Sequence, residues 1–284
     1  MLGKVLTICL MDLDTVLCRT CAVEHGSEPP QTCRICADER QYIPPGGQQW
    51  VSLAELTAEG HHVEVNELEP GLHELRAVPE VGIGQRSKLL CTQAGNLLWD
   101  PLGFIDERSV AAVRDRGNVV AIVASHPHMF GVQVEWSHAL GRVPVLVADA
   151  DLEWLARADP VIESWGGDLD VLPGVTLAQP GGHFPGSAVA HWGAGADGRG
   201  VLLSGDTVLP NPDRATVSFM RSYPNRIPLS AAVVDRLARD LGRFRFDRLY
   251  GNFAEFIPAD ASTAVQQSAQ RHIDWVRGHF DHLT

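Results

Sequence analysis

The stretch of sequence that decides the fold is VVAIVASHPHMFG, residues 119–131. Its first part, residues 119–125, is a continuous run of mostly apolar residues, which predicts a β-strand covered on both faces. His126 and His128 follow this strand, and a turn at Pro127 lets both imidazoles point toward one place. The stretch therefore predicts a buried core strand with two candidate metal ligands at its end.

Two more polar segments follow predicted strands further along the chain. His183 lies in PGGHFPGS, residues 180–187, where glycine and proline let the backbone bring an imidazole close to another loop. Asp206 comes directly after the apolar run VLLSG, a position that suits a helix N-cap or a metal ligand. Three histidines and one aspartate, all at strand ends, are a ligand set that zinc or iron binds.

The residues around these segments alternate between predicted strands and predicted helices. Strands are expected at 72–78, 87–93, 96–100, 143–149, 175–179, 187–192 and 201–206, with a hairpin at Ala94-Gly95. Helices are expected at 109–116, along a stripe from Leu229 to Leu241, and along a second stripe from Val265 to Phe280. This mixture predicts an α/β sandwich, with helices covering the faces of sheets.

The order of the three polar segments, HxH after a buried strand, then GHxPGS, then SGD, resembles the metallo-β-lactamase fold superfamily. The resemblance covers the chain from about residue 70 to the C-terminus. It implies an αββα sandwich of two mixed β-sheets with the metal site at one edge. It also implies a hydrolytic function in which the metal activates water and polarises the scissile bond.

The sequence departs from the superfamily pattern at the second metal position. The superfamily motif is HxHxDH, but Phe130 stands at the place of its aspartate and Gly131 at the place of its last histidine. Asn252, in YGNF, stands where a final ligand histidine is usual. The resemblance therefore implies one metal ion at most, Zn²⁺ or Fe²⁺, held by the three histidines and the aspartate already named.

These residues predict a metal-dependent hydrolase with a reduced, mononuclear site. His126, His128 and His183 would hold the ion, and Asp206 would complete the ligand sphere or accept a proton as general base. Because no second ion clamps a leaving oxygen, a small ester, thioester or lactone is expected in preference to a phosphodiester. Two alternatives stay open: an inactive member of the fold used for binding, and a redox member with iron at a cysteine site.

The loop after Asp206, residues 207–230, is long and proline-rich, and loops at this place border the active site in the superfamily. Arg221 can bind a carboxylate bidentately and Tyr223 offers a hydroxyl to an oxyanion, so both are candidates for substrate binding. The alternative of equal weight is that both are ordinary exposed loop residues. His138 and His191 are interpreted as structural.

Four of the six cysteines form two CxxC pairs inside nineteen positions: Cys18, Cys21, Cys33 and Cys36. This spacing meets the tetrahedral demand of a structural Zn²⁺ ion, and two disulfides are the alternative in an oxidising compartment. The intervening residues 22–32 are polar and rich in proline, so metal binding would supply the folding energy. His25, in this interval, is expected to be a solvated loop residue and not a further ligand.

A turn cluster, PPGG at residues 44–47, marks the expected end of this zinc ribbon. The predicted division of the chain is an N-terminal extension at residues 1–15, the ribbon at 16–45 and a metallo-β-lactamase-like domain at 46–284. A homodimer formed through the small ribbon is a further hypothesis.

The net charge of the chain argues against some classes of binding partner. Lys and Arg total 23 against 35 Asp and Glu, a formal net charge of −12, which argues against nucleic acid and anionic membrane as partners. A small-molecule substrate is expected instead. No cleavage site follows the short apolar start and no apolar run approaches a membrane span, so a cytoplasmic location is expected.

Overall fold

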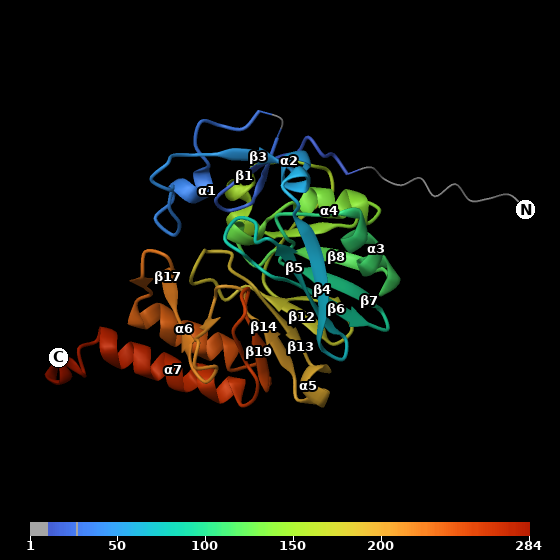
Figure 1. Ribbon diagram of the computed structural model, residues 1–284. Coiled ribbons are helices and arrows are strands. Elements are labelled where there is room, and N and C mark those ends of the chain that lie inside the picture. The colour runs from blue at the N-terminus through green and yellow to red at the C-terminus, as the bar shows by residue number, and fades with distance from the viewer. Residues whose placement is uncertain (1–10, 27) are drawn as a thin grey trace, which may run out of the picture.

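The computed structural model describes residues 11–26 and 28–284, so residues 1–10 of the predicted extension lie outside the described residues. Two large mixed β-sheets pack face to face, with helices on their outer faces (Figure 1). A small sheet near the N-terminus lies at one end of the sandwich. This layering is the predicted αββα arrangement.

The first large sheet has the strand order β10-β9-β8-β7-β6-β5-β4. Its strands are β4 (His62–Glu69), β5 (Leu72–Val78), β6 (Ser87–Thr92), β7 (Gly95–Trp99), β8 (Val119–Val123), β9 (Val145–Ala148) and β10 (Ile162–Trp165). Pairing is antiparallel from β4 to β7 and parallel from β7 to β10. The predicted buried strand is β8, in the parallel half of this sheet.

The second large sheet has the order β11-β12-β13-β14-β19-β20. Its strands are β11 (Leu169–Leu172), β12 (Val175–Ala178), β13 (Val189–Trp192), β14 (Val201–Leu203), β19 (Arg248–Tyr250) and β20 (Phe256–Ile257). Only β14 and β19 pair in parallel within it. Two short ribbons, β15 (Leu209–Pro210) with β16 (Val217–Ser218) and β17 (Met220–Ser222) with β18 (Ile227–Pro228), occupy the long loop after β14.

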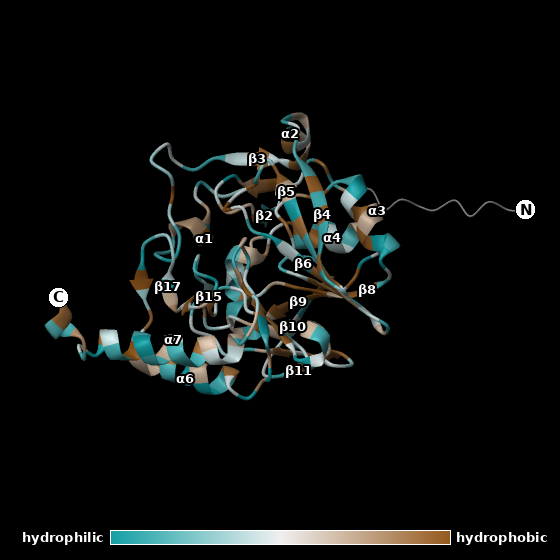
Figure 2. Ribbon diagram, turned by 60° about the horizontal axis from the view of Figure 1, so that its bottom comes forward, coloured by the Kyte–Doolittle hydropathy of each residue, from teal (hydrophilic) through white to brown (hydrophobic). Residues whose placement is uncertain are grey.

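The core consists of layers because successive residues of a strand point to opposite faces. Ile122 of β8 faces the outer helical layer of the first sheet, whereas Val123 lies between the two sheets. Leu203 of β14 also lies between the sheets, and Leu202 faces the outer helices of the second sheet. Figure 2 shows the inner strand β9 as hydrophobic, whereas α6 and α7 carry hydrophilic residues in alternation with hydrophobic ones.

The helices are α1 (Arg34–Ala37), α2 (Leu53–Ala58), α3 (Glu107–Asp115), α4 (Gln133–Ala139), α5 (Gly195–Gly198), α6 (Ala231–Leu241) and α7 (Ala261–Val276). Three of the helices, α2, α3 and α6, begin at a side-chain cap. Asp106 caps α3 and Ser230 caps α6 through their side chains. Leu229 and Phe280, which the helical stripes included, lie just outside α6 and α7. Within the described residues, no helix combines the length and the apolarity that crossing a membrane requires.

The small sheet joins the cysteine-rich segment to the rest of the fold. Its order is β2-β1-β3, with β1 (Val16–Cys18), β2 (Glu24–His25) and β3 (Trp50–Ser52). Because β3 lies beyond residue 45, the sheet extends past the predicted end of the ribbon. The four ribbon cysteines belong to the same hydrophobic cluster as residues of β8 and β9. The division of the chain into domains stays a prediction.

Candidate metal centres

The predicted ligands meet at one edge of the sandwich. His126 and His128 follow β8, His183 lies in the loop between β12 and β13, and Asp206 follows β14. None of the four residues is more than 5 % exposed, and one ligand atom of each lies within 4.8 Å of the others. We call this group the His/Asp centre.

The distances within the His/Asp centre match a tetrahedral metal site. His183 Nε2 lies 3.3 Å from His128 Nδ1, and Asp206 Oδ2 lies 3.6 Å from His126 Nε2 and 3.8 Å from His183 Nε2. Nitrogen or oxygen ligands about 2.0–2.1 Å from a tetrahedral ion are about 3.3–3.4 Å apart. The residues present therefore fit a metal ion such as zinc.

The other nitrogens of two of these rings are occupied, which leaves the inner nitrogens free. His126 Nδ1 lies 2.9 Å from Ser125 Oγ, and His126 Nε2 is buried without a hydrogen-bond partner among the described residues. His183 Nδ1 donates to Met220 O at 3.1 Å, so its Nε2 presents a lone pair to the centre. Such outer partners fix the tautomer and direction of a metal-binding imidazole.

Burial also sets the charges of the ligands. It lowers the pKa of His183 to about 4 and holds the pKa values of His126 and His128 well below the usual range. Burial raises the pKa of Asp206 to about 7, a shift that a hydrogen bond from Asn252 opposes. Neutral imidazoles are the form that binds metal, so the centre needs no deprotonation of histidine near neutral pH.

Asp100 is a supporting residue that sequence reasoning missed. It is fully buried at the end of β7 with φ of +54°, and its Oδ1 accepts the N–H of Ser125, the residue before His126. Asp100 thereby fixes the backbone from which the first ligand projects. A carboxylate directly after the apolar strand NLLW was the available signal.

The second metal position is filled by groups that do not bind metal. Phe130 is buried, and Gly131 has φ of +52°, with space for a Cβ blocked by Pro101 O at 2.2 Å. Asn252 Nδ2 lies 3.5 Å from Asp206 Oδ1. In the described residues, the only groups of three or more ligands suited to an ion are the His/Asp centre and the cysteines.

Arg221 and Tyr223 lie beside the centre, and both have partners within the protein. Arg221 forms an ion pair with Glu39. The ring of Tyr223 lies 5.8 Å from that of His183, and its hydroxyl donates to backbone carbonyls, with Ser218 O at 3.1 Å and Asp206 O at 3.3 Å. A role for either in substrate binding stays a prediction.

Two other histidines lie outside the His/Asp centre. His138 pairs with Asp159, and His191 bonds to Arg245 O, as structural side chains do.

The four cysteines form a second buried group, the four-cysteine cluster. The Sγ atoms of Cys18 and Cys36 are 3.6 Å apart, and those of Cys21 and Cys33 are 3.8 Å apart. Sulfurs about 2.3 Å from a tetrahedral zinc are about 3.8 Å apart, whereas a disulfide needs about 2.05 Å. The cluster therefore fits a metal ion and contains no disulfide.

The expectation that His25 is a solvated loop residue was wrong. It lies in β2, is 5 % exposed and packs edge-on against the ring of Trp50 at 4.5 Å. It is a buried residue because β2 pairs with β1 and places it in the small sheet.

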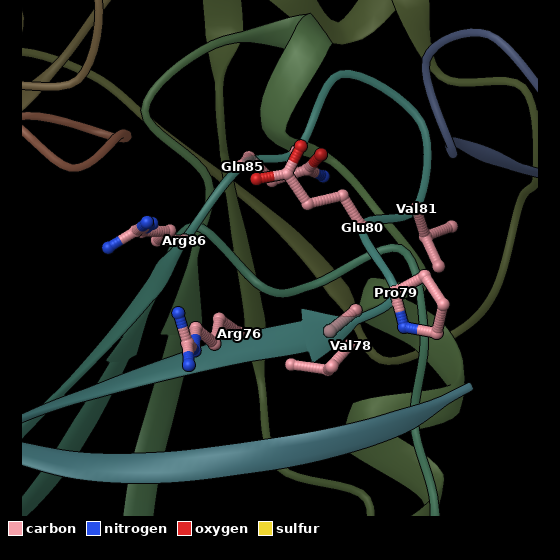
Figure 3. Close-up of a pocket in the computed structure, with 9 residues that line it drawn as sticks. Arg76, Val78, Pro79, Glu80, Val81, Gln85 and Arg86 are labelled. Atoms are coloured by element: carbon pink, nitrogen blue, oxygen red, sulfur yellow. The ribbon is translucent and has the colours of Figure 1, made fainter. Parts of the chain in front are cut away.

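A separate cavity lies beside the loop between β5 and β6 (Figure 3). It has a volume of about 270 Å³, and its lining includes Arg76, Glu80, Gln85 and Arg86. Both polar atoms of the buried Gln85 amide have no hydrogen-bond partner among the described residues. Arg86 N donates to Asn252 O at 2.8 Å, so this loop is tied to the edge of the His/Asp centre.

No protein-family model matches the chain, but a curated protein is similar to it over most of its length. The Bacillus subtilis (strain 168) protein YmaE, described as uncharacterized, is 40 % identical over 261 residues, which cover 90 % of this chain and 95 % of YmaE.

Solved structures share the fold at low sequence identity. The DIM-1 metallo-β-lactamase aligns with a TM-score of 0.55 and 12 % identity over 74 % of this chain and 98 % of its own. The Flv1 flavodiiron core from Synechocystis sp. PCC6803 aligns with a TM-score of 0.52 and 11 % identity over 75 % and 61 %. The chain therefore has the metallo-β-lactamase fold and belongs to the family of Bacillus subtilis YmaE.

Proposed function

We propose that this protein is a metal-dependent hydrolase with a single metal ion in the His/Asp centre, acting on a small ester, thioester or lactone. The observation that carries the proposal is the convergence of three imidazole nitrogens and one carboxylate oxygen at separations of 3.3–3.8 Å for the pairs measured. Buried ligands of this type, placed at tetrahedral spacing, are what a zinc or iron site needs.

A metal ion held there supplies Lewis acidity, which polarises a carbonyl and makes water a stronger acid. The chain supplies the rest. His126, His128 and His183 hold the ion as neutral imidazoles, and Asp206 offers Oδ2 to the same point. A carboxylate within hydrogen-bond distance of water could also act as general base there. Asn252 fixes the carboxylate by donating to Oδ1.

The filled second position limits the substrate class. Phe130 and Gly131 supply no ligand, and Asn252 is neutral, so no second cation would stabilise the leaving oxygen of a phosphodiester. Esters, thioesters and lactones have carbonyl groups that one Lewis acid can polarise. The DIM-1 metallo-β-lactamase shares the fold alone, and the substrate class proposed here rests on the residues of this centre.

The test combines metal content with activity. Purified protein is analysed for zinc and iron and assayed with chromogenic esters, thioesters, lactones and phosphodiesters. The same measurements are made on His183→Ala and on the control His191→Ala, whose ring bonds to a backbone carbonyl away from the centre. We expect His183→Ala to lose one metal equivalent and the activity, and His191→Ala to keep both. Activity that survives in His183→Ala would overturn the proposal.

A second candidate is a binding protein without catalysis. The observation that favours it is the closure of the centre: none of its four ligands is more than 5 % exposed, so little of it meets solvent. If the wild type holds metal in the His/Asp centre and hydrolyses no substrate of the panel, this candidate replaces the hydrolase. Iron in the four-cysteine cluster with a red colour would instead favour the redox alternative.

A further inference from the structure

The segment that follows the four-cysteine cluster lies against the His/Asp centre. We call residues 38–41 the strap, since they begin two residues after Cys36. Ser222 Oγ donates to Arg40 O at 3.0 Å, and Asn225 Nδ2 lies 2.9 Å from Glu39 O and 3.0 Å from Gln41 O. The strap is therefore bound along its length by the loop that contains β17.

Arg40 connects the strap to a metal-ligand loop. It is 6 % exposed, and its Nε donates to His183 O at 2.8 Å. Its Nη1 lies 2.7 Å from Asp38 Oδ1, and its guanidinium lies 4.1 Å from the ring centroid of Phe184. A buried guanidinium with these contacts fixes the backbone of residues 183–184 from one side.

The strap also contacts the segment that contains Met220, whose carbonyl accepts the hydrogen bond from His183 Nδ1. Met220 precedes the residues that bind the strap. Arg221 adds an ion pair with Glu39 of the strap. The backbone of His183 and the carbonyl that orients its ring are thus both attached to residues 38–41.

The four-cysteine cluster fixes where the strap begins. Cys33 and Cys36 lie at either end of a single helical turn, in which Ala37 N donates to Cys33 O. A helix this short is not stable alone, so the bonds that the cysteines make to a metal would hold it in place.

We propose that Arg40 is a positioning residue for His183, and that metal in the four-cysteine cluster sets the metal affinity of the His/Asp centre by holding Arg40 in place. This inference rests on the proposed function only in that the His/Asp centre binds a metal ion. It adds a link between the two sites through Arg40 and His183, which lie 143 residues apart in sequence.

The test uses Arg40→Ala, Arg40→Lys and the control Arg34→Ala in the full chain. Arg34 lies in the same segment but pairs with Glu153 at the surface, with 58 % of its side chain exposed. Cobalt(II) is the probe, because its visible absorption distinguishes a nitrogen and oxygen site from a thiolate site. Affinity at the His/Asp centre is measured by chelator competition, with the cobalt-thiolate absorption showing that the cysteine cluster is loaded.

We expect Arg40→Ala to weaken cobalt binding at the His/Asp centre by about 10- to 100-fold, the usual cost of losing an outer partner of a metal ligand. Arg40→Lys should recover part of this loss, since it keeps a donor and a charge, and Arg34→Ala should bind as the wild type does. Equal affinity and equal spectra for Arg40→Ala and Arg34→Ala would overturn the inference.

A second variant, Cys36→Ser, tests whether the four-cysteine cluster affects the His/Asp centre. It should weaken cobalt binding at the His/Asp centre to the level of Arg40→Ala, and adding Arg40→Ala to it should cause little further loss. If the wild type binds cobalt in both sites but hydrolyses nothing, the proposed function fails, and the comparison of Arg40→Ala with Arg34→Ala still decides this inference. If the wild-type His/Asp centre binds no cobalt, both fail.

Discussion

Gly131 provides the sharpest test of why the second metal position is absent. Its φ of +52° is a left-handed conformation that side chains disfavour, and a Cβ built there would lie 2.2 Å from Pro101 O and 2.6 Å from Leu102 O. Both obstacles are backbone atoms of a buried segment, and Leu102 O already accepts the N–H of Val132 at 3.0 Å. Replacing Gly131 therefore requires the backbone to move.

The cost of Gly131→Ala follows from these two effects. The left-handed conformation costs about 1–2 kcal/mol for a residue with a Cβ. Forcing a methyl group into a well-packed interior adds about 1–3 kcal/mol. We expect Gly131→Ala to lower the free energy of unfolding by about 3–5 kcal/mol, taking the upper part of the sum because the carbonyls cannot rotate away.

Urea denaturation of the metal-loaded protein measures this loss, and Gly167→Ala is the matched control. Gly167 has φ of +71° with no atom within 4 Å of the added Cβ, so only the conformational part of about 1–2 kcal/mol applies. The reasoning is refuted if Gly131→Ala costs no more than Gly167→Ala. Gly131→His, which restores the residue of the superfamily motif, should destabilise the protein and gain no second metal equivalent.

Three further predictions follow. Burial raises the pKa of Asp151 to about 6, so the contribution of Asp151 to stability should fall as pH rises from about 4 to 6. Asp151→Asn, which keeps an acceptor for Gly186 N, should therefore gain stability relative to wild type by up to about 3 kcal/mol over that range, measured as the difference between the two proteins in denaturation at several pH values. Gln85→Leu should leave the free energy of unfolding unchanged or raise it by about 1 kcal/mol, because the amide has no hydrogen-bond partner in residues 11–26 and 28–284; a lowered free energy of unfolding in urea denaturation would contradict this. Removing metal with a chelator should increase amide hydrogen exchange first in residues 16–52, and uniform exchange across the chain would contradict this.

Two segments of the His/Asp centre could be predicted from sequence because they follow apolar strands, whereas His183 lies inside a longer loop and was predicted from its glycine- and proline-rich surroundings. The apolar run before His126 and the run before Asp206 are local patterns, and strand ends meet at the edge of a sheet. The same locality predicted the hairpin of β6 and β7. The four cysteines were predictable for a similar reason, because CxxC pairs place two sulfurs on one short turn.

The supporting residues could not be predicted in this way. Arg40 lies in a polar segment without periodicity, and its partner His183 is far away in sequence, so no local pattern connects them. His25 shows the opposite error, because a polar and proline-rich interval suggested solvent while pairing of β2 with β1 buried the ring. In both cases the environment of the side chain depends on a contact with another segment, which no local sequence pattern shows.

We expect the charges around Asp206 to favour one metal ion over two. In a two-metal centre this carboxylate would lie between two cations, which could neutralise both of its oxygens. Here Oδ2 faces His126 and His183, while Oδ1 accepts a weak hydrogen bond from the neutral amide of Asn252 at 3.5 Å. Burial raises the pKa of Asp206 to about 7, and the hydrogen bond from Asn252 opposes this shift only in part. Replacing Asn252 alone cannot restore the second site, since Phe130 and Gly131 would still supply no ligand and the backbone at Gly131 admits none.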